Sequence, residues 1–280
     1  MKPAPFEYHA PTTIDDVLDL LRSHGDDAKL LAGGQSLVPM LALRLTRFEH
    51  LVDVNRVAGI DGITRANGTL RIGATTRQRA LERDDRVAAS VPLLAVAAPH
   101  IGHFQIRNRG TVGGSLAHSD PAAELPAVAV ALDAGFEVGD RVVPAMDFFT
   151  GPWTTCLGDD ELLSAARFPV WDGDVRASVQ EVARRHGDFA LAGAVVQVAL
   201  DADGRVTRAG IGLIGMASTP WHAIAAEQAL IAGAPPLDVA HVAVRDTDPN
   251  DDIHASASQR RRMAIAMVER ALREVTSARA

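Results

Sequence analysis

Two short glycine-containing segments hold the residue types that bind phosphate groups. The first is Ala32-Gly33-Gly34-Gln35-Ser36-Leu37, and the second is Thr111-Val112-Gly113-Gly114-Ser115. Glycine lets the backbone reach positive φ and approach a ligand closely, and free N–H groups at a helix start, together with hydroxyl groups, satisfy anionic oxygens. Either segment alone is also compatible with an ordinary tight turn, whereas two such loops together could clamp a pyrophosphate from both sides.

The spacing of these glycines excludes two common nucleotide sites. Neither segment is a G-x-x-x-x-G-K-[ST] loop, and neither is a G-x-G-x-x-G turn with a ribose-binding acid about 20 residues further on. The sequence therefore favours neither an ATPase nor a Rossmann dehydrogenase. A dinucleotide-binding fold of another type is expected.

Other side chains with reactive or metal-binding groups have simpler interpretations. Cys156 is the only cysteine, so the chain cannot form an internal disulfide, a thiolate zinc site or a cysteine-ligated iron–sulfur cluster. His100 and His103 lack an obvious third metal ligand and are interpreted as structural. We expect the acidic run 246–252 to be a solvated turn that caps the final helix, and Arg260, Arg261 and Arg262 to form a solvated helix face toward a partner subunit.

The pattern around the first glycine segment predicts the elements that position it. Residues 13–24 have apolar side chains at helical spacing, with Thr12 or Thr13 available as the N-cap. A short buried strand at 29–32 runs into the glycines, a helix carries Leu37, Met40 and Leu41, and a strand follows at 50–54. We expect a unit of strand, glycine turn, helix and strand.

The rest of the chain is predicted to contain a second region and then a second domain. A strand is expected at 70–74, helices at 76–83 and 87–98 with a break near Pro92, and a strand at 127–132. After a linker at 171–174, strands at 190–200 and 209–216 flank the turn 201–204. The chain then ends in helices.

Length, charge and hydropathy limit the class of protein. The 280 residues suffice for two ordinary domains. With 35 acidic against 28 basic side chains, the chain lacks the basic excess that binding to nucleic acid or an anionic membrane surface would require. No apolar stretch is long enough to span a bilayer and no signal peptide is recognised, so we expect a cytoplasmic protein.

Four longer strings resemble one protein family. AGGQSLVPML at 32–41 and IRNRGTVGGSLAHSDPAAELP at 106–126 resemble the two signature loops of the FAD-binding subunit of carbon monoxide dehydrogenase, xanthine dehydrogenase and related molybdenum hydroxylases. EVARRHGDFALAG at 181–193 resembles the start of that family's C-terminal flavoprotein domain, and DIHASASQRRRMA at 252–264 resembles its closing helix. The resemblance covers nearly the whole chain.

The resemblance implies an α+β fold with two domains. Residues 1–175 would form an FAD-binding domain of the p-cresol methylhydroxylase type, with subdomains at about 1–56 and 57–175. Residues 176–280 would form a C-terminal flavoprotein domain with a small antiparallel sheet and helices. FAD would lie between the lobes.

The resemblance also implies the residues that contact FAD. Ala32, Gly33, Gly34, Gln35, Ser36 and Leu37 map to the first pyrophosphate loop, and Thr111, Gly113, Gly114 and Ser115 map to the second. Glu124 would reach the adenosine portion, Ile101 would cover the isoalloxazine ring, and Leu163 lies near a position that contacts adenine. Gln180 departs from the lysine that xanthine dehydrogenases have there, which puts that contact in doubt.

The function implied by the resemblance is electron transfer through FAD, with no catalytic side chain and no metal in this chain. Electrons would come from a small [2Fe–2S] subunit and leave to an external acceptor, while the substrate would react at the molybdenum cofactor of a large subunit, in a dimer of heterotrimers. Two alternatives remain: a stand-alone FAD-dependent oxidoreductase and a flavin-free scaffold. The organic substrate and the final acceptor do not follow from the sequence.

Overall fold

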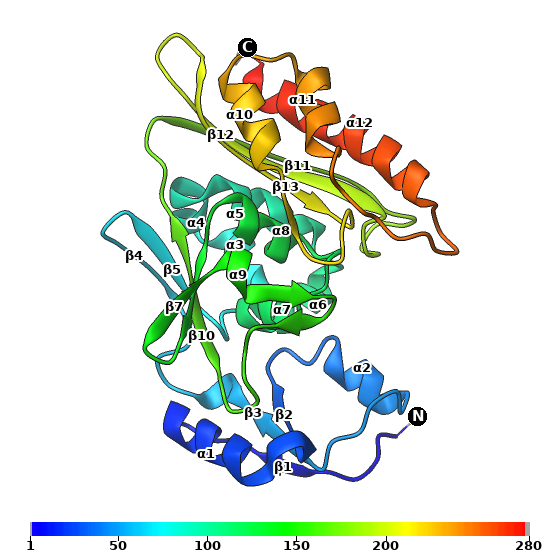
Figure 1. Ribbon diagram of the computed structural model, residues 1–280. Coiled ribbons are helices and arrows are strands. Elements are labelled where there is room, and N and C mark those ends of the chain that lie inside the picture. Colours follow the sequence, from blue (N-terminus) through cyan, green and yellow to red (C-terminus); the bar gives the residue numbers. More distant parts are fainter. Residues whose placement is uncertain (1, 278–280) are drawn as a thin grey trace.

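The computed structural model describes residues 2–277, arranged around three main β-sheets (Figure 1). The first sheet belongs to the N-terminal part of the chain, the second to the middle and the third to the C-terminal part. Helices of the middle region lie between the second and third sheets (Figure 1). This mixture of helices and separate sheets agrees with the expected α+β class.

The N-terminal unit contains the parallel sheet β1-β3-β2, formed by β1 (Glu7–His9), β3 (His50–Asp53) and β2 (Ala28–Leu31). Helix α1 (Ile14–His24) begins at Thr13, whose hydroxyl accepts a hydrogen bond from Asp16 N, so the expected cap is confirmed. Helix α2 (Leu37–Ala42) follows the first glycine segment. The apolar core of this unit is small, with eight buried residues: Val17, Leu21, Ala28, Val52, Val54, Val57, Ile60 and Leu162.

The second sheet has the strand order β4-β5-β10-β6-β7. These strands are β4 (Ile63–Ala66), β5 (Thr69–Gly73), β10 (Leu163–Pro169), β6 (Gly135–Val138) and β7 (Arg141–Pro144). Between β5 and β6 the chain forms α3 (Gln78–Arg83), α4 (Asp85–Ser90), α5 (Pro92–Ala97), α6 (Phe104–Arg109), α7 (Val112–His118) and α8 (Glu124–Ala131). The expected break of the helix at 87–98 is confirmed. Helix α4 ends at Ser90, and Pro92 is the first residue of α5.

The strand expected at 127–132 is wrong, because these residues belong to helix α8 and its C-cap Leu132. All eight residues of α8 are buried. A helix that is covered on every side reads as a continuous apolar run, and such a run cannot be distinguished from a buried strand by periodicity alone. The alanines in this run favour the helix.

The third sheet is antiparallel and has the order β11-β12-β13-β14. Its strands are β11 (Asp174–Val182), β12 (Ala192–Leu200), β13 (Val206–Ile214) and β14 (Trp221–His222). One face packs against α10 (Ile224–Ile231) and α12 (Ala257–Thr276), with α11 (Pro236–Ala243) beside α12, and the other face packs against α5 and α8 (Figure 1). All nine residues of β12 are therefore buried.

The remaining short elements are η1 (Gly25–Asp27), η2 (Val54–Arg56), η3 (Ala98–His100), α9 (Ala145–Phe148), β8 (Phe149–Gly151) and β9 (Thr154–Thr155). Within residues 2–277, no helix combines the length and hydropathy that crossing a bilayer requires.

Candidate functional site

The first glycine loop presents a row of unpaired backbone amides. Gly33, Gly34, Gln35 and Ser36 lie between β2 and α2, and within the described residues their four N–H groups donate no hydrogen bond. Gly34 has φ +73°, which favours glycine. One carbonyl group of the loop has a partner inside the loop, because Gln35 Nε2 donates to Gly33 O at 3.0 Å. A row of free N–H groups at a helix start is suited to bind an anion.

The second glycine loop leads into α7 and is fixed to the chain segment that follows β5. Gly113 N donates to Ala74 O at 2.8 Å, and Val112 N donates to Thr76 O at 2.9 Å. The Thr111 hydroxyl accepts from Gly114 N at 3.0 Å and so caps α7. Thr111 and Gly113 are buried, while Gly114 and Ser115 are partly exposed.

The two loops are in contact with each other. A Cβ atom on Gly33 would lie 2.6 Å from both Arg109 O and Gly110 Cα, and a Cβ atom on Gly114 would lie 3.3 Å from Ala32 Cβ. Only glycine at position 33 allows this approach. The structure therefore brings together the two segments that were expected to clamp a pyrophosphate, although they are more than 70 residues apart in the sequence.

Asn55 and Arg77 connect the two loops and were not predicted from the sequence. Asn55 Nδ2 donates to Ala32 O at 2.8 Å, and its Oδ1 accepts from Arg77 Nη2 at 2.8 Å. Arg77 Nη1 also donates to Arg109 O. Burial, and then the charge of Arg109, lower the pKa of Arg77. No local motif marks either residue, because their role depends on strands and helices that meet only in the folded chain.

Glu124 lies at the first turn of α8, near two other ionisable side chains. Burial raises its pKa to about 7, and the negative charge of Glu181 on β11 adds to this shift. His100 Nδ1 lies 3.2 Å from Glu181 Oε1, and the hydrogen bond to Glu181 raises the pKa of His100. Within the described residues, Glu124 is thus close to a carboxylate and an imidazole, and its contact with adenosine stays a prediction.

The other predicted contacts have different surroundings. Ile101 is buried at the end of η3, in the turn before α6, the helix that ends at Arg109 beside Gly33. Leu163 is the first residue of β10 and is buried in the main core. Leu37 starts α2 and is partly exposed. The roles of all three in cofactor binding stay predictions.

Gln180 points to the closing helix. Its Nε2 donates to Glu274 Oε2 on α12 at 2.8 Å. Ser178 Oγ donates to the same carboxylate oxygen at 2.7 Å. The side chain at position 180 is therefore engaged within the C-terminal part of the chain.

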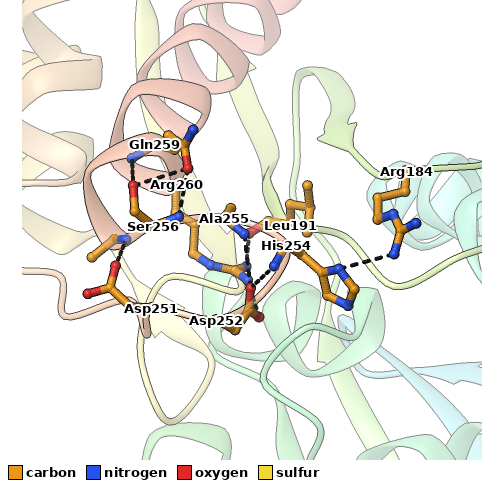
Figure 2. Close-up of polar contacts among 10 residues, drawn as sticks. Arg184, Leu191, Asp251, Asp252, His254, Ala255, Ser256, Gln259 and Arg260 are labelled. Atoms are coloured by element: carbon orange, nitrogen blue, oxygen red, sulfur yellow. Dashed lines mark hydrogen bonds and ion pairs between the residues drawn. The ribbon is translucent and has the colours of Figure 1, made fainter.

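The two C-terminal signature strings contact each other (Figure 2). Arg260 Nη1 donates to Leu191 O, and its Nη2 lies 2.6 Å from Asp252 Oδ2. His254 Nδ1 lies 3.1 Å from Arg184 Nη1. The expectation of a solvated Arg260 is wrong, since this side chain is 9% exposed and fixes the start of α12 to the end of the loop 183–191.

The acidic run before α12 does cap that helix. Asp251 Oδ1 accepts from Ala257 N, and Ser256 forms a capping box with Gln259 (Figure 2).

The loop 183–191 also contacts the helix before the second glycine loop. A Cβ atom on Gly187 would lie 2.7 Å from the ring of His103, the N-cap of α6. The C-terminal strings are thus joined to the helix that leads to the second glycine loop.

Comparison with known proteins agrees with this arrangement. Residues 4–171 match the FAD binding domain in molybdopterin dehydrogenase, and residues 177–275 match the CO dehydrogenase flavoprotein C-terminal domain. The chain belongs to the FAD-binding subunits of the molybdenum hydroxylases. It is thus an FAD-binding oxidoreductase subunit, as the resemblance implied.

Individual relatives match over almost their full length. The alpha subunit of the 6-hydroxypseudooxynicotine dehydrogenase complex of Paenarthrobacter nicotinovorans is 41% identical, over 97% of this chain and 95% of its own. The medium chain of carbon monoxide dehydrogenase of Hydrogenophaga pseudoflava is 37% identical over 97% of each chain. A solved structure of carbon monoxide dehydrogenase from that organism superposes with a TM-score of 0.94 at 38% identity, covering 99% of this chain and 100% of the other.

The residues of this FAD-binding subunit fit the pyrophosphate of FAD. The four free N–H groups of the first loop supply donors, and the close contact of Gly33 with Gly110 leaves no room for side chains between the loops. A Cβ atom on Gly114 would point toward Ala32, which shows that the second loop faces the first. Glycine at these positions thus allows the two loops to approach each other closely, and their contact with phosphate stays a prediction.

Proposed function

We propose that this chain is the electron-transfer subunit of a three-subunit molybdenum hydroxylase. It would bind one FAD, receive electrons from a small [2Fe–2S] subunit and deliver them to an external acceptor. The large subunit, with the molybdenum cofactor, would oxidise the organic substrate. The full-length match to a carbon monoxide dehydrogenase medium chain supports this role.

The observation that carries the proposal is the pair of glycine loops held together by Asn55 and Arg77. Bound FAD would supply the two-electron redox chemistry. The side chains and amides of this chain would bind and orient it: the N–H groups of residues 33–36 toward phosphate, and buried Ile101 as an apolar surface for the ring system. With Cys156 as its only cysteine, the chain cannot ligate the iron–sulfur cluster.

We also propose that two heterotrimers associate and that the complex is cytoplasmic. The names of the relatives as medium chain or complex subunit support a multi-subunit assembly. Size-exclusion chromatography with light scattering, applied to the co-expressed subunits, measures the stoichiometry. A single heterotrimer would contradict the dimeric part of the proposal.

Rapid mixing tests the relay directly. The small subunit is reduced with dithionite, freed of excess reagent and mixed without oxygen with the oxidised FAD-loaded chain. We expect the visible flavin band to bleach, and mixing with buffer in place of the reduced small subunit serves as control. No bleaching with wild type would overturn the relay. Turnover of an organic substrate by this chain alone would support the stand-alone oxidoreductase, and absence of bound FAD would support the scaffold.

A further inference from the structure

Three histidines from three different elements meet on the N-terminal unit. His9 is the last residue of β1, His24 is the last residue of α1 and His50 is the first residue of β3. One potential ligand atom from each lies within 4.8 Å of the others, and all three side chains are partly buried. The sequence shows no short metal-binding motif here, because the spacings of 15 and 26 residues follow from the fold.

The separation of two rings in this histidine triad suits a tetrahedral metal ion. His9 Nε2 and His50 Nδ1 are 3.1 Å apart, and two imidazole nitrogens bound to one zinc ion lie about 3.3 Å apart when each Zn–N bond is about 2.0–2.1 Å. The His24 ring stacks on that of His50 with 3.6 Å between the ring centroids. One nitrogen of His24 lies within 4.8 Å of a nitrogen in each of the other two rings, so the triad can supply three nitrogen ligands after local side-chain adjustment.

The charges around the triad favour a cation. Glu7 Oε2 lies 3.5 Å from His50 Nδ1, so a carboxylate lies beside the triad. His24 is at the C-terminal end of α1, where the helix dipole favours positive charge. His9 and His24 also line an open hollow of about 460 Å³ together with Asp16 and Asp19. This hollow gives a route from solvent.

We propose that His9, His24 and His50 bind one divalent transition-metal ion of the zinc type, with Glu7 as the fourth ligand. The site is formed by β1, α1 and β3 and does not include the glycine loops. A metal there would join β1, α1 and β3 of a unit whose core has only eight buried residues. Binding of metal to a folded site stabilises the fold that forms it, so the ion would have a structural role.

Zinc titration of the untagged, FAD-loaded chain tests the proposal. The protein is stripped with a chelator, desalted and titrated with Zn²⁺ by calorimetry, and its melting temperature is measured with and without Zn²⁺. We expect one Zn²⁺ per chain and a higher melting temperature. The double variant His9→Gln/His50→Gln should bind Zn²⁺ at least about 100-fold more weakly, since loss of even an outer-shell partner costs about 10- to 100-fold.

Two controls keep the outcome clear. His241→Gln removes an exposed histidine on α11, outside the triad, and should leave Zn²⁺ affinity unchanged. His24→Gln changes the end of α1 alone and should weaken binding even if the double variant folds poorly. X-ray absorption of zinc-loaded wild type should show three imidazole ligands. Equal Zn²⁺ affinity in wild type and in a folded triad variant would overturn the proposal. FAD binding is measured in the same variants and should be normal, because the metal site is separate from the glycine loops.

Discussion

The two glycine loops have similar sequences but different supports. The second loop is hydrogen-bonded to residues 74–78 and leads into α7, whose apolar side chains lie in the main core. The first loop belongs to a unit with a small core, and it reaches the rest of the protein through Gly33, Asn55 and Arg77. The second loop is thus a fixed surface, and the first loop completes the site by docking against it.

This difference explains where the unpaired donors are. In the second loop, the N–H groups of Val112, Gly113, Gly114 and Ser115 have partners within the chain. In the first loop, the N–H groups of residues 33–36 have none among the described residues. The first loop therefore has donors that remain free to bind an anion, whereas the second loop offers a rigid backbone surface.

The largest effect is expected for Gly33→Val. Its Cβ would lie 2.6 Å from Arg109 O and Gly110 Cα, so the loops must separate. We expect FAD affinity to fall at least about 1,000-fold, equivalent to about 4 kcal/mol, with normal circular dichroism. Bound FAD after gel filtration is the measurement. The control Gly158→Val, where the nearest neighbours are side-chain atoms at 3.6 Å or more, should retain FAD, and full FAD content in both variants would refute the docking of the loops.

The second effect is the pH dependence of the unfolding free energy that arises from Glu124, in the helix after α7. The pKa of Glu124 rises from 4.5 to about 7 on folding, so the folded chain binds more protons than the unfolded chain between these values. Stability is therefore greatest below pH 4.5 as far as Glu124 is concerned, and it falls as pH rises toward 7, by about 3 kcal/mol. The raised pKa of His100 acts in the same direction.

Glu124→Gln measures this contribution. Urea unfolding at several pH values between 5 and 8 should show a smaller loss of unfolding free energy in the variant than in wild type. Glu269→Gln, at a partly exposed position of α12 paired with Arg273, is the control and should keep the wild-type slope. An unchanged slope in Glu124→Gln would show that Glu124 ionises normally.

An intermediate effect is expected from alanine at the two adjacent glycines of the second loop. A Cβ on Gly113 would lie 2.8 Å from Ala74 Cα and closer still to its Cβ, whereas a Cβ on Gly114 meets the Thr111 hydroxyl at 2.7 Å. Overpacking against backbone costs about 1–3 kcal/mol. Gly113→Ala should therefore lower the unfolding free energy by about 2 kcal/mol. Compared with Gly113→Ala, Gly114→Ala should lower the unfolding free energy less and the FAD affinity more. A larger loss of stability in Gly114→Ala than in Gly113→Ala would contradict a rigid second loop.

Sequence reasoning predicts the parts of this candidate site that depend on local sequence. Gly33, Gly34, Gly113 and Gly114 carry a turn signal that depends on a few neighbouring residues, and Thr13 is a cap for the same reason. Asn55, Arg77 and the histidine triad were missed because their partners are distant in sequence. Helix α8 was mistaken for a strand because burial on all sides removes the polar face that marks a helix. The domain boundary at 175/176 and the division near residue 56 stay predictions.

The smallest effect is expected at the bridge between the loops, and a double-mutant cycle isolates it. Arg77→Met removes the donor to Arg109 O and Asn55 Oδ1, and Asn55→Ala removes the donor to Ala32 O. Each change leaves carbonyl or amide groups unpaired, so we expect each to weaken FAD binding about 10-fold, or about 1.4 kcal/mol. Because both residues act through one chain of hydrogen bonds, the double variant should lose less than the sum, with a coupling of about 1 kcal/mol. Fluorescence titration of the FAD-free chain with FAD measures the four affinities.

Arg83→Met, on the exposed side of α3, is the matched control and should bind FAD as wild type does. Strict additivity of the two bridge variants would mean that Asn55 and Arg77 support their own loops separately, and that the first loop docks through Gly33 alone.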